Sequence, residues 1–354
     1  MNSLNFNIFV STVCNLKCSY CYESIDDTHT LMTIETADKV IEFIIGKFYR
    51  LMPKKIYITF HGGEPLLGIN IVNYMIDEFN SKIRAELYYR MTTNATLYKK
   101  SMLPTLQKIH DLSISIDGEK KTHDANRIFA DGGGTFDIVI ANLKTLLDEK
   151  IELTARLVIT STTYKEIYDN FVFLVECGVR KFSMELDFTT FTWSEEQIRE
   201  YIILAKKILD KINELQKVDI FIETGLLQNG IKKPQNYLCD GGIGTFSILA
   251  SGAVYPCTIA VNNKRFCMGT VFGEINNGIV DEIQEMGSKS ISKCEGCGRY
   301  DYCISTRCRI VNKVLFGDYL EPSPINCVIQ RISMELSKYA LKKSYKIWHT
   351  NRNV

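Results

Sequence analysis

The stretch STVCNLKCSYCYE, residues 11–23, carries three cysteines, Cys14, Cys18 and Cys21, separated by three and then two residues. The preceding run LNFNIFVS, residues 4–11, alternates apolar and polar side chains, which predicts a β-strand. The cysteines therefore lie in a loop directly after a strand, where the curved backbone can direct three thiolates toward one centre. Three thiols are an incomplete ligand set for most metals.

Two kinds of metal centre are compatible with this triad. A structural zinc site takes four Cys or His ligands, and only His29 is close enough in the sequence to be the fourth. A four-iron four-sulfur cluster held by three thiolates leaves one iron open for a small molecule. The other segments of the chain agree better with the cluster than with zinc or a chance grouping.

Composition limits the class of protein. The chain has 354 residues, 45% of them hydrophobic, which is enough for one large and one smaller domain. Its 42 basic and 41 acidic residues nearly cancel, so the charge indicates neither a nucleic acid nor an anionic membrane as partner. Without a signal peptide or a membrane-spanning apolar run, we expect a cytoplasmic protein, in which twelve cysteines favour metal ligands over disulfides.

The first 215 or so residues alternate strand-like and helical patterns. The expected strands are 4–11, 54–63, 86–94, 112–118, 153–161 and 180–188. The expected helices are 33–52, 70–83, 97–109, 135–150, 164–178 and 193–217. This βα repeat predicts the α/β class with a parallel sheet. Six units are too few for a closed barrel, so we expect a partial (β/α)6 TIM-like barrel with its site at the carboxyl ends of the strands.

The pattern changes from about Asp219 to Gly, Cys and short strands, followed by a final helix over 327–346. We therefore predict two domains, a barrel over 1–218 and a small cysteine-rich domain over 219–354. The second domain has few apolar residues per cysteine, which indicates that metal is needed to hold it.

Polar residues follow several of the predicted strands. The second strand ends in FHGGEP, where Gly62 and Gly63 permit close backbone approach and Glu64 supplies a carboxylate. The ends of later predicted strands carry further polar residues, Asn94, Ser115 and Asp117, and the segment HDANR supplies Arg127. The planar guanidinium suits a carboxylate. Each of these residues could instead stabilise its own loop.

The triad resembles the signature of the radical S-adenosylmethionine superfamily, Cys-x3-Cys-x2-Cys with an aromatic residue before the third cysteine, here Tyr20. The resemblance implies that the amino and carboxylate groups of S-adenosylmethionine complete the cluster, which on reduction cleaves this cofactor to methionine and a 5′-deoxyadenosyl radical. It also implies that Gly62, Gly63 and Glu64 hold the methionine ammonium, and that Asn94, Ser115, Asp117 and Arg127 lie near the cofactor.

The C-terminal cysteines resemble the SPASM domain, which carries two auxiliary four-iron four-sulfur clusters, so three clusters are expected in all. The resemblance implies one outer set, Cys294, Cys297, Cys303 and Cys327, and one inner set, Cys239, Cys257 and Cys308. Cys303 and Cys308 enclose four residues where the family usually has three. A zinc ribbon is the alternative, but it leaves too many cysteines unexplained.

The fourth position of the inner cluster is open to two interpretations. Cys267 fills it, which the sequence favours slightly, or it stays open for a substrate thiolate. Cys177 is expected to be a buried small hydrophobe. Both interpretations involve electron transfer, for which the resemblance implies a flavodoxin or ferredoxin as donor.

SPASM enzymes act mostly on peptides or proteins, and two subfamilies fit the length. Sulfatase maturases, which form formylglycine, have an Asp directly after the cysteine equivalent to Cys257, whereas this chain has Thr258. Because a threonine hydroxyl is a poor general base, we favour a maturase of ribosomally made peptides that installs a thioether, a carbon–carbon crosslink or an epimerised residue. Its substrate would carry a leader sequence, for which a separate recognition protein is one candidate binder. A non-catalytic iron–sulfur electron carrier or binding module is the remaining alternative.

Overall fold

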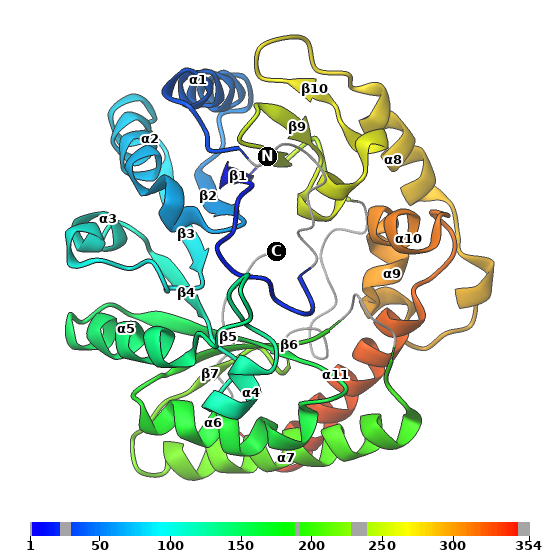
Figure 1. Cartoon of the computed structure of the whole chain (residues 1–354). Helices are drawn as coiled ribbons and strands as arrows, with labels where there is room; N and C mark the ends of the chain where they lie inside the picture. The colour runs from blue at the N-terminus through cyan, green and yellow to red at the C-terminus, as the bar shows by residue number, and fades with distance from the viewer. Residues whose placement is uncertain (1, 22–29, 188–191, 228–238, 346–354) are drawn as a thin grey trace.

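The structure is a computed structural model that describes residues 2–21, 30–187, 192–227 and 239–345. Its centre is a ten-stranded sheet in the order β10-β9-β8-β1-β2-β3-β4-β5-β6-β7. The pairs from β8 through β1 to β7 are parallel, whereas β9 pairs antiparallel with both β8 and β10. The sheet curves into an open barrel with helices on its outside (Figure 1).

All six predicted strands are present. The strands are β1 Ser3–Ser11, β2 Lys55–Gly62, β3 Glu86–Thr93, β4 Asp111–Ser115, β5 Leu153–Ile159, β6 Lys181–Leu186, β7 Glu223–Thr224, β8 Thr245–Ile248, β9 Ala253–Tyr255 and β10 Gly269–Thr270. The predicted fold class, α/β with a parallel sheet followed by a cysteine-rich C-terminal region, is confirmed.

Helices cover the outer face of the sheet. The longer ones are α1 Ile34–Leu51, α2 Ile69–Lys82, α5 Phe136–Asp148, α6 Ile167–Glu176, α7 Glu195–Gln216, α8 Gly278–Ser288, α10 Arg309–Phe316 and α11 Pro324–Lys342. The short ones are α3 Leu103–Leu106, α4 Lys120–Asp124 and α9 Ile304–Arg307. The helix predicted over 97–109 is wrong in extent, because only a 3-10 turn and α3 form there. Pro104 lies in the first turn of α3 and could not sit inside a longer helix.

The two faces of the barrel strands differ in chemistry. On β1, Leu4, Phe6 and Ile8 are fully buried against the helices. The alternate residues point inward, and the strand register sets them beside one another around the barrel. The inward-facing polar residues include Asn5, Asn7, Thr59, His61, Arg90, Ser113, Ser115, Arg156 and Ser183. The barrel interior is therefore polar enough to receive water or a polar substrate.

The predicted boundary at residue 218 does not interrupt the sheet. Strands β7 and β8 both lie beyond it, and β8 pairs with β1. Helix α11 packs along α7, where Lys206 pairs with Glu335 at 2.6 Å and the Tyr339 hydroxyl donates to Asp210 at 2.8 Å. The two predicted domains therefore share one sheet and one hydrophobic core.

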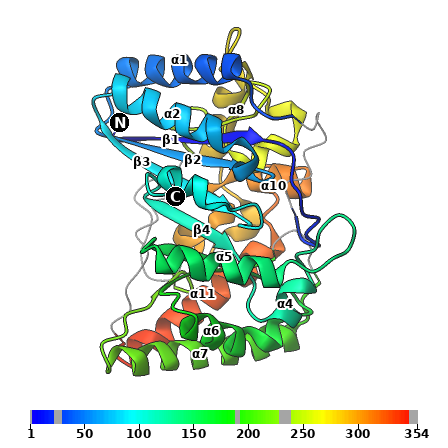
Figure 2. The same cartoon turned by 60° about the vertical axis from the view of Figure 1, so that its left-hand side comes forward.

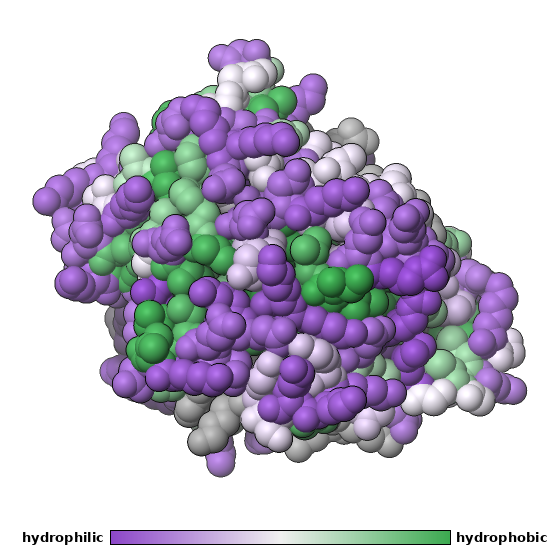
Figure 3. All heavy atoms as spheres, turned by 90° about the horizontal axis from the view of Figure 1, so that it is seen from below, coloured by the Kyte–Doolittle hydropathy of each residue, from purple (hydrophilic) through white to green (hydrophobic). Residues whose placement is uncertain are grey.

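The side of the molecule seen from below in Figure 3 is mostly hydrophilic, with apolar residues in separate patches. Exposed apolar residues such as Ile203 on α7, which is 65% exposed, are normal when they occur singly. No helix in the described part of the chain combines the length and apolarity that a bilayer crossing needs.

Replacement of Gly62 by Ala tests the junction at the end of β2. Gly62 has φ +124°, and an added Cβ would lie 1.9 Å from the Ser11 carbonyl oxygen. We expect Gly62→Ala to lower the free energy of unfolding by at least about 2 kcal/mol, as measured by anaerobic urea denaturation. Gly46→Ala is the control, because Gly46 lies in α1 and a Cβ added there would have nothing within 4 Å, so this change should stabilise by up to about 1 kcal/mol. Equal effects of the two substitutions would contradict the prediction.

Candidate functional site

Backbone hydrogen bonds fix the cysteine loop to the end of β2. The amide of Gly63 donates to the Ser11 carbonyl at 2.9 Å, and the amide of Glu64 donates to the Val13 carbonyl at 3.0 Å. A Cβ on Gly63 would lie 2.3 Å from the Val13 oxygen and 2.8 Å from the Cys14 nitrogen. Glycine is therefore required here so that β2 can approach the backbone that carries the first cysteine.

Two more segments hold the same loop. At the end of β3, the Asn94 side-chain amide donates to Asn15 at 3.0 Å, and the Asn15 amide donates to Thr96 at 2.8 Å. After α4, the carbonyls of Ile128 and Asn126 accept from Lys17 and Ser19. The loop and the segment after α4 lie together at the same end of the barrel (Figure 2), which is the carboxyl end of the parallel strands.

Glu64 is fully buried and is satisfied within the protein. One carboxylate oxygen accepts from the Leu66 amide at 2.9 Å and from the Thr93 hydroxyl at 2.6 Å, and the other accepts from the Asn94 amide at 2.7 Å. Burial raises the pKa of Glu64 to about 7, although these hydrogen bonds oppose the shift. The side chain thus ties the end of β2 to the end of β3.

A buried ion pair lies beside Cys18, the second cysteine of the triad. Arg127 and Asp117 are paired at 3.1 Å, with side-chain exposures of 7% and 1%. The other Asp117 oxygen accepts from the Tyr20 hydroxyl, and the Arg127 guanidinium lies 5.3 Å from the centre of the Tyr20 ring. Burial raises the pKa of the Cys18 thiol, while the neighbouring Arg127 opposes that rise. The triad therefore touches a positive charge through Cys18.

Sequence reasoning missed the residues that support this ion pair. The Asp117 amide donates to His123 Nδ1 at 3.4 Å, His123 Nε2 lies 2.9 Å from the Thr135 hydroxyl, and that hydroxyl donates to the Arg127 carbonyl at 2.7 Å. Burial lowers the pKa of His123 to about 4, so the imidazole stays neutral. Thr93, Asn15 and Thr96 were missed in the same way, since their partners are distant in the sequence. Their only signal was a polar side chain next to a strand end.

The predicted site residues thus come together at one end of the barrel. Ser115 ends β4 and lies in register with Arg156 on the inner face. The Asn94 side chain bonds to Asn15 and Thr96 and lies 3.9 Å from the Cys14 sulfur. Arg127 keeps one buried nitrogen, Nε, without a hydrogen-bond partner. Contacts of these residues with a cofactor remain predictions, and His29 lies outside the described residues.

The three thiols of the triad influence one another. Desolvation raises the pKa of Cys14 to about 12, and Cys18 and Cys21 add to the rise. Within the described residues no three His, Cys, Asp or Glu side chains are arranged to hold a single metal ion. The centre that the triad would hold therefore remains a proposal.

The C-terminal cysteines fall into two groups of mutually interacting thiols. Cys294 and Cys327 each interact with both Cys297 and Cys303. Separately, the pKa of Cys257 is raised by burial and further by Cys308 and Cys239. The outer and inner ligand sets that the resemblance implies remain a prediction.

Cys267 and Cys177 stand apart from these groups. Cys267 packs beside the same small apolar cluster as the inner set, which contains Phe266 and Ile310, but its thiol donates to the Gly269 carbonyl at 3.6 Å. Cys177 caps the end of α6, half-buried, as a small side chain. That Cys267 is the fourth ligand of the inner cluster remains a prediction.

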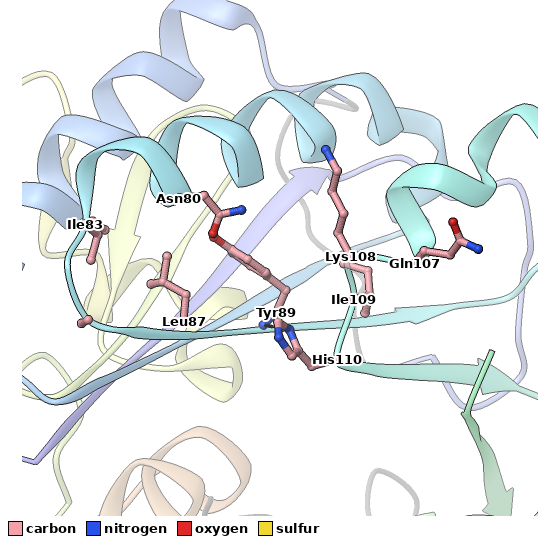
Figure 4. Close-up of a pocket in the computed structure, with 9 residues that line it drawn as sticks. Asn80, Ile83, Leu87, Tyr89, Gln107, Lys108, Ile109 and His110 are labelled. Atoms are coloured by element: carbon pink, nitrogen blue, oxygen red, sulfur yellow. Dashed lines mark hydrogen bonds between the residues drawn. The ribbon is translucent and has the colours of Figure 1, made fainter. Parts of the chain in front are cut away.

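A shallow cavity of about 490 Å³ lies elsewhere on the molecule (Figure 4). Tyr89, Asn80 and His110 line it, and it is located between the end of α2 and the starts of β3 and β4. The amino ends of parallel strands lie opposite to their carboxyl ends, so this cavity is remote from the cysteine triad. The candidate site is the carboxyl end of the barrel.

Residues 8–174 match the profile of the Radical SAM superfamily. The cysteine-type anaerobic sulfatase-maturating enzyme of Clostridium novyi (strain NT) is 24% identical over 83% of this chain and 85% of its own. The chain carries a radical SAM domain and is a radical SAM modifying enzyme, as the triad predicted. This family implies S-adenosylmethionine and a four-iron four-sulfur cluster as cofactors.

Two solved structures share the fold. Native anSMEcpe with bound AdoMet and the Kp18Cys peptide superimposes with a TM-score of 0.77 at 20% identity, covering 96% of this chain and 98% of that one. Streptococcus suis SuiB bound to precursor peptide SuiA gives 0.67 at 18% identity, covering 92% and 76%. The likeness includes the cysteine-rich C-terminal region, because almost the whole chain is covered.

Conversion of Asp117 to Asn tests the buried ion pair. We expect Asp117→Asn to lower the free energy of unfolding by about 3–5 kcal/mol, because Arg127 would keep a buried charge without a counter-ion. The measurement is urea denaturation under anaerobic conditions. Asp77→Asn removes the partner of Lys108 from a pair whose side chains are 55% and 36% exposed, and should cost about 1 kcal/mol or less. Similar losses in both variants would show that burial of the pair is unimportant.

Proposed function

We propose that this enzyme is a maturase of ribosomally made peptides that uses S-adenosylmethionine to abstract a hydrogen atom from its substrate. The observation that carries the proposal is the cysteine loop, which the ends of β2 and β3 and the segment after α4 fix at the carboxyl end of a barrel with polar inward-facing residues. A peptide chain entering that interior would meet hydrogen-bonding groups such as Ser115, Arg156 and Asn7.

The residues present fit a cluster with S-adenosylmethionine bound to it. Cys14, Cys18 and Cys21 supply three soft thiolate ligands from one loop, the donor type that iron–sulfur clusters use. Gly63 lets the end of β2 pack directly against the backbone of Cys14, which fixes the position of the first ligand. The unpartnered Nε of buried Arg127 offers a hydrogen bond to an anionic group. When bound, the cofactors supply the radical that removes the substrate hydrogen.

Within this proposal the site residues have two kinds of role. Ser115 and Arg127 contact the cofactor, while the backbone of Gly62 and Gly63 shapes the space next to the cluster. Glu64, Asn94, Asp117 and Tyr20 hold the loop and the guanidinium in place through the hydrogen bonds described above. Leu16 and Tyr20 of the loop are both under 10% exposed, and their side chains exclude water from the side of the loop that faces the sheet.

The two groups of C-terminal thiols are proposed to hold two auxiliary clusters. Burial keeps the pKa of Cys239, Cys257, Cys294 and Cys327 above their usual range, so metal ligation is the route by which these thiols become thiolates. The clusters would pass electrons to or from the substrate site, with a flavodoxin or ferredoxin as external donor. We propose that residues 1–218 hold the catalytic cluster with S-adenosylmethionine and that residues 219–354 hold the auxiliary clusters.

The substrate class has a second candidate. The relatives include sulfatase-maturating enzymes, which favour formation of formylglycine from cysteine about as strongly. Thr258 favours the first proposal, because it follows Cys257 at the start of a 3-10 turn and offers a hydroxyl where sulfatase maturases are expected to have a carboxylate base. Mass spectrometry of a cysteine-containing sulfatase peptide after incubation distinguishes them: an aldehyde product supports the second candidate, and an unchanged peptide supports the first.

Replacement of Cys14, Cys18 and Cys21 by Ala tests the cluster count. We expect roughly twelve irons per chain after anaerobic reconstitution and about eight in the triple variant, at four irons per cluster. Cleavage of S-adenosylmethionine under reducing conditions should disappear in the variant, because the other clusters have no open iron at the barrel end. About four irons in the unmodified protein, or zinc in the C-terminal region, would remove the auxiliary clusters from the proposal.

Replacement of Cys267 by Ala tests the inner cluster. We propose Cys267 as the fourth ligand, which requires its thiol to give up the hydrogen bond to the Gly269 carbonyl, so we expect Cys267→Ala to lose about four irons. Cys177→Ala is the matched control at a thiol outside both groups. Full iron and sulfide content in Cys267→Ala would remove Cys267 from the inner set.

A further inference from the structure

Arg309 is the largest fully buried side chain in the described part of the chain, with 1% of its surface exposed. It is the first residue of α10 and follows Cys308 directly. Its guanidinium donates to two backbone carbonyls, that of Lys289 at 2.6 Å and that of Ser305 at 3.5 Å. Its Nε atom is buried without a hydrogen-bond partner.

Arg309 differs from the other buried arginine in having no carboxylate partner. Arg127 is paired with Asp117, whereas no Asp or Glu of the described residues forms a salt bridge of 4.0 Å or less with Arg309. Carbonyl oxygens satisfy donors but carry no net charge. A buried cation is strongly unfavourable unless a negative charge lies beside it. The surroundings of Arg309 must therefore contain another source of negative charge.

Arg309 lies on the short segment that connects the two proposed cysteine sets. Cys308 of the inner set precedes it directly, and Ser305, whose carbonyl accepts from its guanidinium, lies between Cys303 of the outer set and Cys308 in the chain. Desolvation lowers the pKa of Arg309, and Tyr300, Cys294 and Cys308 oppose that shift. Metal-bound cysteines of these sets would supply negative charge to this segment.

We propose that Arg309 is the shared counter-ion of the two auxiliary clusters and raises the reduction potential of both. This inference rests on the proposed function, because it requires both clusters to be present. A cluster ligated by thiolates is anionic, and reduction by one electron adds negative charge. A fixed cation in a low-dielectric setting stabilises the reduced form more than the oxidised form, so it favours uptake of the electron.

Arg309→Met tests the proposal by removing the charge and keeping an unbranched apolar side chain. The measurement is an EPR-monitored redox titration of the reconstituted full chain without S-adenosylmethionine. We expect the ratio of reduced to oxidised auxiliary cluster to fall at least tenfold at fixed potential, which is about 59 mV for one electron. The catalytic cluster, held by the barrel loop, should titrate as in the unmodified protein and serves as an internal reference.

Two further variants separate charge from structure. Arg309→Lys keeps the charge and should restore most of the potential, whereas a purely structural role would make it as damaging as Arg309→Met. Arg331→Met removes an arginine of α11 that is 35% exposed and paired with Glu195 at 3.0 Å, so solvent screens it and no shift is expected. If Arg309→Met does not retain its iron, Arg309→Gln, which keeps a donor without the charge, is titrated in its place.

The outcomes distinguish this inference from the proposed function. Full iron content with unshifted auxiliary potentials in Arg309→Met or Arg309→Gln overturns the counter-ion role and leaves the clusters in place. Equal shifts in Arg309→Lys and Arg309→Met, or a shift in Arg331→Met, overturn it as well. An unmodified protein with only about four irons overturns both this inference and the auxiliary clusters.

Discussion

The close backbone contact between the end of β2 and the cysteine loop is the constraint on which the site depends. Gly62 and Gly63 let the end of β2 and the cysteine loop form backbone hydrogen bonds where any side chain would collide with Ser11 or Val13. Through this contact, backbone hydrogen bonds between the two segments continue past Ser11, the last residue of β1. As a result the first cysteine takes its direction from the barrel, and the rest of the triad follows within one short loop.

Buried charge is the second organising feature, and the molecule handles it in two ways. At the barrel end, Arg127 is neutralised by Asp117, whose other oxygen accepts the Tyr20 hydroxyl, so the ion pair also orders the loop. In the C-terminal region, Arg309 donates to two backbone carbonyls and has no carboxylate partner among the described residues. Both guanidinium groups lie beside cysteines, which connects charge compensation to the places where anionic metal clusters are proposed.

The continuity of the sheet relates the two cysteine-rich regions to each other. Strand β8 pairs with β1, so the segment with the inner set begins next to the strand that carries the triad. At the far side, α11 packs on α7 through Lys206 and Asp210. A chain joined to the barrel at both ends holds its thiols at a fixed position relative to the triad, which electron transfer between them would require.

The sequence by itself determined the strands and most of the helices of the barrel. Alternating strands and amphipathic helices are local patterns, so the six barrel strands were predictable, whereas the two C-terminal cysteine sets follow from a family resemblance and remain a prediction. The helix over 97–109 was not predictable, because Pro104 limits it to one turn. Only the tertiary structure decided what the polar residues do: Glu64 and Asp117 bond to residues 29 and more positions away, and Arg309 is buried against the carbonyls of Lys289 and Ser305. Hydrogen-bond partners and burial arise when distant segments pack, and no local pattern in the chain specifies them.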